Sequence, residues 1–318
     1  MNKNEMTKKI KRRDLTVYLT IRLLVIIVMI LEILQGEWEN VFLCAFTLVL
    51  LLIPIVINRR LIIKLPNVFE NIILIFIFAA EILGEVANFY THFPHWDTIL
   101  HTLNGFLCAA LGFSLVDLLN RSDKFSKRLT PIFVAIVAFS VSMTIGVLWE
   151  FFEFSADKLV LTDMQKDTNL QIVSSVSLNP EKKNKAIIID DIEKTVIYGK
   201  DKDGNNIEYV VENGYLDIGL NDTMEDLAVN FIGATVFSIL GYLYIKHRDG
   251  KYKFVESFIL TLKNEEELAK VKKEIEEYET QLKLKKEKQN KKKSNINKSI
   301  NKNTQKSNKI EDNKNENK

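Results

Sequence analysis

Residues 95–105 read HWDTILHTLNG, and residues 106–116 continue as FLCAALGFSLV. The second part is apolar enough to continue across a membrane, whereas the first part carries Asp97, His101 and Asn104. These three side chains lie at i, i+4 and i+7, so on a helix they share one face. Ionisable groups are costly in contact with lipid, and they therefore face the interior of a helix bundle, where they find partners. The stretch predicts a membrane-spanning helix that presents polar groups to its neighbours.

The composition separates an apolar body from a polar tail. The chain has 318 residues, of which 47% are hydrophobic, and its formal net charge is +2. Residues 17–120 are mostly apolar, whereas the chain beyond Lys283 is rich in Lys, Asn and Gln and cannot bury enough surface to order itself. Because the basic charge is concentrated in the tail and in short loops, the composition does not indicate a nucleic-acid-binding protein.

The two cysteines, Cys44 and Cys108, each lie in an apolar run, and no CxxC spacing is present. They are expected to be small buried side chains, and neither a disulfide framework nor a zinc knuckle is indicated.

Six apolar runs approach the ~20 residues that are needed to cross a bilayer core of ~30 Å. We expect these helices at residues 17–34, 41–57, 68–89, 97–119, 129–152 and 223–244. The predicted fold class is therefore an all-α polytopic membrane protein with six transmembrane helices. Its expected regions are an N-terminal segment at 1–16, helices 1–5 within 17–153, an insert at 154–221, helix 6 at 222–245, and a helix followed by a Lys/Asn-rich tail at 246–318.

Basic residues alternate between successive connections. Lys and Arg occur in residues 1–16, in loop 58–64, in loop 120–128 (Arg121, Lys124, Lys127 and Arg128) and after residue 246, but they are absent from loops 35–40 and 90–96. The positive-inside rule places the basic connections in the cytoplasm. Both termini are then cytoplasmic, the insert is extracytoplasmic, and the protein is a multi-pass protein of the cell membrane.

Two segments outside the helices carry a pattern of their own. In the insert, Ala186–Ile189, Thr195–Tyr198 and Ile207–Val211 are typical of strands, so we expect a small β hairpin or meander. After helix 6, a 3-4 spacing links Leu268, Val271, Ile275, Tyr278 and Leu282. This seam is shorter than a coiled coil requires, so it predicts either one amphipathic helix or a dimer contact.

On this topology, four helices carry polar side chains at their outer ends. They are Glu81, Glu85 and Asn88; Asp97, His101 and Asn104; Glu150, Glu153 and Asp157; and Asp222, Glu225, Asp226 and Asn230. Because Lys and Arg are absent from these ends, the carboxylates must take up protons or a cation. Carboxylate, imidazole and amide groups suit a divalent ion such as Mg²⁺, Mn²⁺ or Zn²⁺, and a two-metal site could activate water for hydrolysis.

Each of these residues also has a structural interpretation. His101 could be a hydrogen-bonded core histidine, and Glu150 with Glu153 could form a solvated helix end. Asp222, with Glu225 at the third helical position, fits an N-terminal capping pattern. The cap and the site interpretation of Asp222 are compatible.

The same residues form motifs in a recognisable order. They are Gly84-Glu85 followed by Tyr90, Asp97-x-x-x-His101-x-x-x-Gly105, Trp149-Glu150-x-x-Glu153, and Asp222-Thr223-x-x-Asp226 followed by Gly233-Ala234. Over about residues 80–240 the chain resembles the YjdF-like family of bacterial membrane-spanning proteins and, more loosely, VanZ-like proteins. The family carries no assigned activity, so the resemblance implies membrane residence. It supports a working set of metal ligands, Glu85, Asp97, His101, Glu150, Glu153, Asp222 and Asp226, among which His101, Glu150 and Asp226 are the expected catalytic residues. The long insert and the tail depart from the family pattern.

Three classes of function fit this reading. The first is a metal-dependent hydrolase or transferase that acts on a lipid-linked or phosphorylated substrate, although no P-loop, serine nucleophile motif or Arg-rich phosphate clamp is present. The second is a cation- or proton-coupled transporter, which requires a polar path to the inner face. The third is a non-catalytic membrane scaffold. The expected partners are the lipid bilayer and a lipid or small-molecule substrate, and not nucleic acid.

Overall fold

The computed structural model describes residues 3–120, 129–247 and 250–269, together with residues 273 and 280. The chain forms two units, one of residues 1–57 with 64–261 and one of residues 58–63 with 262–318. The positions of the predicted heptad seam at Val271, Ile275, Tyr278 and Leu282, the tail beyond Lys283 and the basic residues of loop 121–128 lie outside the described residues.

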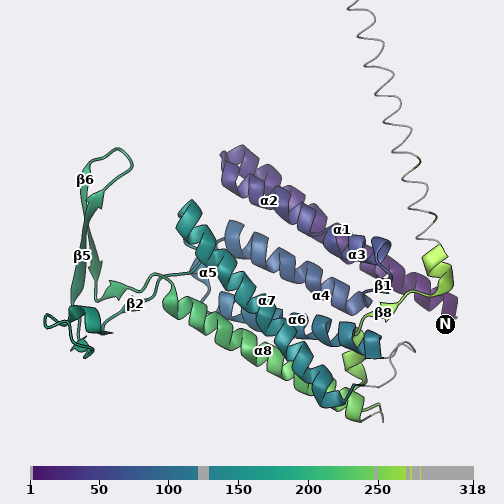
Figure 1. Ribbon diagram of the computed structural model, residues 1–318. Helices are drawn as coiled ribbons and strands as arrows, with labels where there is room; N and C mark the ends of the chain where they lie inside the picture. Colours follow the sequence, from purple (N-terminus) through teal and green to yellow (C-terminus); the bar gives the residue numbers. More distant parts are fainter. Residues whose placement is uncertain (1–2, 121–128, 248–249, 270–272, 274–279, 281–318) are drawn as a thin grey trace, which may run out of the picture. The chain divides into compact units, whose positions relative to one another are not determined.

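The described part of the chain contains six helices that are long and apolar enough to cross a membrane. The candidate spans lie in α1 (Lys3–Gln35), from Thr16 onward; in α2 (Trp38–Leu50) with α3 (Ile53–Arg60), up to Asn58; in α4 (Asn67–Ile77) with the π-helix η1 (Phe78–Val86); and in α6 (Trp96–Asn120), α7 (Pro131–Val160) and α8 (Leu220–Lys246) (Figure 1). These helices confirm the multipass membrane character that the sequence predicts.

Two spans differ from simple α-helices. The second is broken between Leu50 and Ile53, because Pro54 lacks an N–H and clashes with the preceding turn. The third turns π-helical at Phe78 and ends at Val86, short of the predicted end at Phe89. Asn88 follows in the left-handed conformation, with φ 57°, and a short helix α5 (Phe89–His92) comes after it. Asn88 therefore does not share a helix face with the two acids of this span.

Helix α7 is longer than the sequence predicts. It begins at Pro131, where the side-chain oxygen of Thr130 accepts a hydrogen bond from the N–H of Phe133 (3.4 Å). It continues past the predicted end at Phe152 and stops at Val160, where Leu161 adopts a left-handed conformation, with φ 61°. The last turns of α7 therefore extend beyond Glu150 and Glu153 and carry Asp157 on the same helix.

Helices α6, α7 and α8 pack side by side through glycines (Figure 1). A Cβ on Gly105 of α6 would lie 2.2 Å from the backbone oxygen of Asn230, and a Cβ on Gly233 of α8 would lie 2.0 Å from the backbone oxygen of Thr102. Such small residues let helix backbones approach closely in a membrane, where packing rather than water exclusion drives association. The hydroxyl of Ser142 on α7 donates to the Gly105 carbonyl (2.7 Å) and joins the third helix to the pair.

The other spans share a separate apolar core. Its buried members come from α1, α2, the α2–α3 turn, α4 and η1, and they are Ile21, Val25, Cys44, Leu51, Leu74, Ile82 and Val86. Cys44 is thus a buried hydrophobe, as expected, while Cys108 on α6 is half-buried.

Between α7 and α8 the chain forms three antiparallel strand pairs. They are β2 (Asn169–Leu170) with β7 (Tyr215–Leu216), β3 (Val173–Ser175) with β4 (Ile187–Ile189), and β5 (Lys194–Lys200) with β6 (Asn206–Glu212). The turn of the longest pair is held by the Asp201 carboxylate, which accepts the N–H groups of Asp203 and Asn205. A 3₁₀ turn η2 (Val176–Leu178) follows β3 directly, and β1 (Ile63–Lys64), η3 (Lys253–Phe258) and β8 (Thr261–Leu262) complete the described elements.

The glycine contacts predict a large penalty for a single added methyl group. Gly233→Ala places a Cβ against the α6 backbone, which cannot yield as a flexible side chain would. We expect it to lower the free energy of unfolding by about 1–3 kcal/mol, measured by thermal unfolding in detergent. Gly199→Ala is the control, because the nearest atom to its Cβ would be 4.0 Å away. Equal stability of Gly233→Ala and the wild type would contradict the packing described.

Candidate functional site

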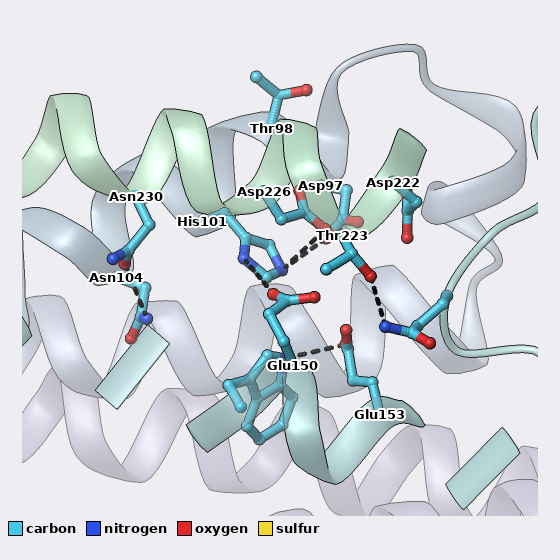
Figure 2. A network of polar contacts seen from close by, with 12 residues as sticks. Asp97, Thr98, His101, Asn104, Glu150, Glu153, Asp222, Thr223, Asp226 and Asn230 are labelled. Carbon is cyan, nitrogen blue, oxygen red and sulfur yellow. Dashed lines mark hydrogen bonds and ion pairs between the residues drawn. The ribbon is translucent and has the colours of Figure 1, made fainter. Parts of the chain in front are cut away.

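Ionisable side chains from three helices meet around His101 (Figure 2). The ring Nε2 lies 3.4 Å from Oδ1 of Asp97, one turn earlier on α6, and 3.6 Å from Oδ2 of Asp226 on α8. The ring Nδ1 lies 3.9 Å from Oε1 of Glu150 on α7. His101 is therefore the point at which ionisable side chains of the three helices meet.

The carboxylates form two groups with the spacing of metal ligands. In the first, Asp97, His101 and Asp226 each offer one ligand atom within 4.8 Å of the others, and in the second Glu150, Glu153 and Asp226 do the same. Ligand bonds of ~2.0–2.6 Å to a common ion bring ligand atoms to such separations. Asp226 belongs to both groups.

Each acid of the second group has one buried oxygen without a hydrogen-bond partner among the described residues. The exposed fractions of Glu150, Glu153 and Asp226 are 4%, 7% and 3%. Within the described part of the chain, Oε2 of Glu150, Oε2 of Glu153 and Oδ2 of Asp226 have no hydrogen-bond partner. The other oxygen of Glu153 accepts the indole N–H of Trp149 (2.8 Å). Because an unpaired buried carboxylate costs several kcal/mol, this arrangement calls for a cation or a proton.

Two asparagines form the floor of the site. Asn104 Nδ2 donates to Oδ1 of Asn230 (3.4 Å), and Asn230 Nδ2 contacts the sulfur of Met143 (3.5 Å). Gly146 gives Asn230 its place, because a Cβ there would lie 2.6 Å from Nδ2. Both amides lie on the predicted polar face, but neither belongs to the two ligand groups.

Two residues of the predicted ligand set lie outside both groups. Glu85 is exposed on η1, and Asp222 is half-buried on the first turn of α8. The Asp222 carboxylate accepts the backbone N–H of Lys166 (2.9 Å) instead. The structure therefore brings Asp97, His101, Glu150, Glu153 and Asp226 together, whereas Glu85 and Asp222 lie outside both groups.

The predicted capping role of Asp222 is wrong. Helix α8 begins at Leu220, and its N-cap is Gly219 in the left-handed conformation, with φ 79°. Asp217 accepts the N–H groups of Gly219 (3.3 Å) and Asn221 (2.8 Å), so it already binds free N–H groups at the start of this helix. Glu225, the other half of the predicted capping pattern, is exposed and lies 3.5 Å from the hydroxyl of Thr98.

A loop of residues 162–168, which we call the strap, connects α7 to the insert. Asp157 accepts the N–H groups of Met164 (2.7 Å) and Gln165 (2.9 Å), and the buried Gln165 side chain donates to the hydroxyl of Thr223. The next residue of the strap, Lys166, donates its backbone N–H to Asp222 on the first turn of α8 (2.9 Å). Sequence reasoning missed the strap, because its place beside the site comes from these tertiary hydrogen bonds and not from a motif.

Tyr90 lies on α5, the short helix that follows η1. Its ring lies against Gly84, where a Cβ would come 2.3 Å from Cε2. Burial, and then the charges of Asp97 and Glu85, raise the pKa of the Tyr90 hydroxyl, so the side chain stays a neutral phenol. The sequence pointed to Tyr90 only through the motif in which it follows the Gly84-Glu85 pair.

Comparison with known proteins places the chain in a family. The family model described as "Predicted membrane protein (DUF2238)" matches residues 16–176, which is more than half of the 318-residue chain. The chain belongs to the DUF2238 family. The resemblance to YjdF-like membrane proteins is consistent with it. The match includes Asp97, His101, Glu150, Glu153 and the strap, whereas α8 with Asp226 lies outside the matched range.

A protein of Thermotoga maritima titled "Uncharacterized protein" is 29% identical over 84 residues. The similar stretch covers 26% of this DUF2238 chain and 41% of the Thermotoga protein, so the chain spans less than half of that relative. No solved structure matches the chain significantly.

Asp217 makes the strap of this DUF2238 protein sensitive to acid. Partial burial alone raises the pKa of Asp217, but the N–H groups of Thr168, Asn221 and Gly219 outweigh it, so the pKa is lowered. A lowered folded pKa contributes stability above the unfolded value of about 4, and this stability is lost as the pH falls through the folded pKa. We therefore expect the amide protection of Thr168 in hydrogen exchange, corrected for intrinsic rates, to decrease when the pH is lowered below about 4.

The variant Asp217→Asn removes the titrating group, so its Thr168 protection should be lower at neutral pH and nearly independent of pH. Asp163→Asn, which changes an exposed carboxylate of the same strap, is the matched control. Wild-type protection that is unchanged down to pH 3 would contradict the role of Asp217.

Proposed function

We propose that the protein is a divalent-metal-dependent hydrolase or transferase that acts on a lipid-linked or phosphorylated substrate at the outer face of the cell membrane. The proposal rests on one observation. Two groups of ligand atoms share Asp226, and buried oxygens of Glu150, Glu153 and Asp226 have no hydrogen-bond partner among the described residues.

The donor set decides which ions fit. The group of Asp97, His101 and Asp226 mixes imidazole and carboxylate, which suits Zn²⁺ or Mn²⁺, whereas Glu150, Glu153 and Asp226 offer only carboxylate oxygens, which suit Mg²⁺ or Mn²⁺. A bound pair of ions supplies charge for a phosphoryl or acyl oxygen and activates the nucleophile. Mn²⁺ fits both groups, so it is the ion we choose for testing.

The chain's own residues have separate roles in this proposal. His101 and Asp226 would hold the ions, and the indole of Trp149 donates to one oxygen of Glu153. Glu150 has two carboxylate oxygens, of which one would join the second ligand group and the other would carry the proton. The oxygen of water or an alcohol forms a bond to the phosphorus or carbonyl carbon of the substrate. The bond from that atom to the leaving oxygen breaks, and Glu150 takes the nucleophile's proton and passes it to the leaving oxygen.

The packing beneath the site supports a hydrolase over a transporter. Asn104 and Asn230 close the floor of the site, and the Gly105 contact with the Asn230 backbone lies beside them. Further along α6 and α8, Phe113 and Phe237 are fully buried, with ring centroids 5.9 Å apart. A transporter requires a polar path through this region, where these two apolar rings pack against each other.

The number of Mn²⁺ ions that the wild type and each variant bind tests the proposal. Wild-type protein purified with excess Mn²⁺ should hold two ions per chain. Asp97→Asn and Glu153→Gln should each lose one ion, whereas Asp226→Asn should lose both, because Asp226 serves both groups. The affinity of each lost site should fall by more than the roughly 10–100-fold that removal of an outer-shell partner causes.

Atomic absorption after dialysis measures the stoichiometry. Glu225→Gln is the control, because this acid of the same helix is exposed and lies outside both groups. Wild-type protein that retains no Mn²⁺ after dialysis would refute the hydrolase proposal. A normal phenotype of cells that carry Asp97→Asn, Glu153→Gln or Asp226→Asn would favour the scaffold alternative.

The alternation of basic loops generates a separate prediction about topology. We infer that both termini are cytoplasmic and that the insert is outside. In a background without Cys44 and Cys108, Asn205→Cys in the β5–β6 turn should react with a membrane-impermeant maleimide on intact cells. A cysteine in place of Lys314 should react only after permeabilisation, and the reverse pattern would refute the orientation.

A further inference from the structure

Trp149 on α7 links the exposed surface of the helix to a buried acid of the site. Its side chain is 43% exposed in a helix long enough to cross a membrane, whereas Glu153, one turn later, is 7% exposed. The indole Nε1 donates a hydrogen bond to Oε1 of Glu153 (2.8 Å) (Figure 2). Tryptophan is common at the depth of lipid head groups, where its N–H usually meets a polar group of the interface. Here the N–H instead meets an acid of the second ligand group.

This hydrogen bond distinguishes the two oxygens of Glu153. Oε1 accepts the indole N–H, whereas Oε2 is buried and has no hydrogen-bond partner within the described part of the chain. Glu153 offers one ligand atom to the group that it forms with Glu150 and Asp226. The terminal torsion of a glutamate is broad, so a carboxylate without the indole could turn and present either oxygen, or both, to an ion. With the indole bound to Oε1, Oε2 is the oxygen that remains for the ion.

The indole suits this role because it cannot compete for the ion. Its N–H is a donor only, and the neutral ring does not repel a cation. The ring also has a neighbour on the same helix, because it packs against Phe152 with ring centroids 5.4 Å apart. In metal sites, outer hydrogen-bond partners of this kind orient the ligands, and their loss costs roughly 10–100-fold in metal affinity.

The first ligand group does not depend on this hydrogen bond. Asp97 and His101 lie on α6, and the ring of His101 has its closest carboxylate partners in Asp97 (3.4 Å) and in Asp226 of α8 (3.6 Å). Trp149 and Glu153 both lie on α7. Removal of the indole N–H should therefore act on the second ion and spare the first, whereas a general loosening of α7 would not discriminate between them.

We propose that Trp149 is a positioning residue and that its indole N–H holds Glu153 so that one oxygen binds the second ion. This inference rests on the proposed function, because it requires that the two ligand groups bind metal. The alternative is an i,i+4 side-chain pair that only stabilises the helix. The two differ in their consequences, because a pair that only stabilises α7 gives no reason for the second ion to be affected more than the first.

The test titrates Mn²⁺ into the full chain in phosphatidylcholine nanodiscs and measures the free ion by electron paramagnetic resonance. Trp149→Phe keeps an aromatic ring and removes the N–H. We expect it to weaken the second ion by roughly 10–100-fold and to leave the affinity of the first ion nearly unchanged. Trp38→Phe is the matched control, because Trp38 is 69% exposed at the start of α2. It should bind both ions as the wild type does.

Two backgrounds assign the affinities to the ions. In Asp97→Asn protein, which should keep only the second ion, Trp149→Phe should weaken that ion. In Glu153→Gln protein, which should keep only the first ion, Trp149→Phe should have no effect. A further variant separates the N–H from the size of the ring: replacement of the Trp149 indole by benzothiophene, which has sulfur in place of the N–H, should weaken the second ion as Trp149→Phe does.

The outcomes separate this inference from the proposed function. Two ions that bind equally well to the wild type and to both variants without the N–H overturn the positioning role and leave the metal site standing. Normal binding by the benzothiophene variant alone also overturns it, because the volume of the ring would then matter and not its N–H. Equal weakening of both ions overturns it as well. A wild-type protein that binds no Mn²⁺ overturns both proposals.

Discussion

Carboxylates buried in a low-dielectric environment must be compensated, and this requirement governs the end of the α6–α7–α8 trio. Asp226 and Glu150 have exposed fractions of 3% and 4%, and each has an oxygen without a hydrogen-bond partner in the described part of the chain. His101 is the basic group nearest to them, at 3.6 and 3.9 Å. A single imidazole cannot balance several carboxylates, so protons or metal ions must supply the remaining charge.

The packing of the three helices gives this cluster its geometry. Metal ligands must be held to within a fraction of an ångström, and side chains on loosely packed helices cannot provide this. Here the backbone of α8 lies directly on Gly105, and Gly146 accommodates the Asn230 side chain. The helix that carries Asp226 is thus positioned by contacts one turn below the site. A change in those glycines would move the ligands as well as lower stability, so the fold and the site share the same contacts.

The sequence predicted the parts of this structure that depend on periodicity and hydrophobicity. The apolar runs located the six spans, and the spacing of Asp97 and His101 placed both on one face of α6. The π-helical turn at Phe78 could not be predicted in this way, because it changes the hydrogen-bond pattern of the backbone without changing the hydrophobic pattern. The start of α8 was misplaced for a related reason: Gly219 and Asp217 end the preceding loop through backbone conformation and side-chain hydrogen bonds.

The structure also separates two kinds of acid that look alike in the sequence. Asp157, Asp217 and Asp222 each accept backbone N–H groups of the strap or of the helix start, so their charges are already stabilised, and they hold the loop in place. Glu150, Glu153 and Asp226 lie deeper, and each keeps an oxygen without such a partner in the described structure. Carboxylates of the first kind receive backbone N–H donors. Those of the second kind each keep a buried oxygen without a hydrogen-bond partner among the described residues, and this difference is why we propose the metal site at the buried set. The strap at residues 162–168 lies within the part of the chain that the family model matches, and the first set of acids holds it in place.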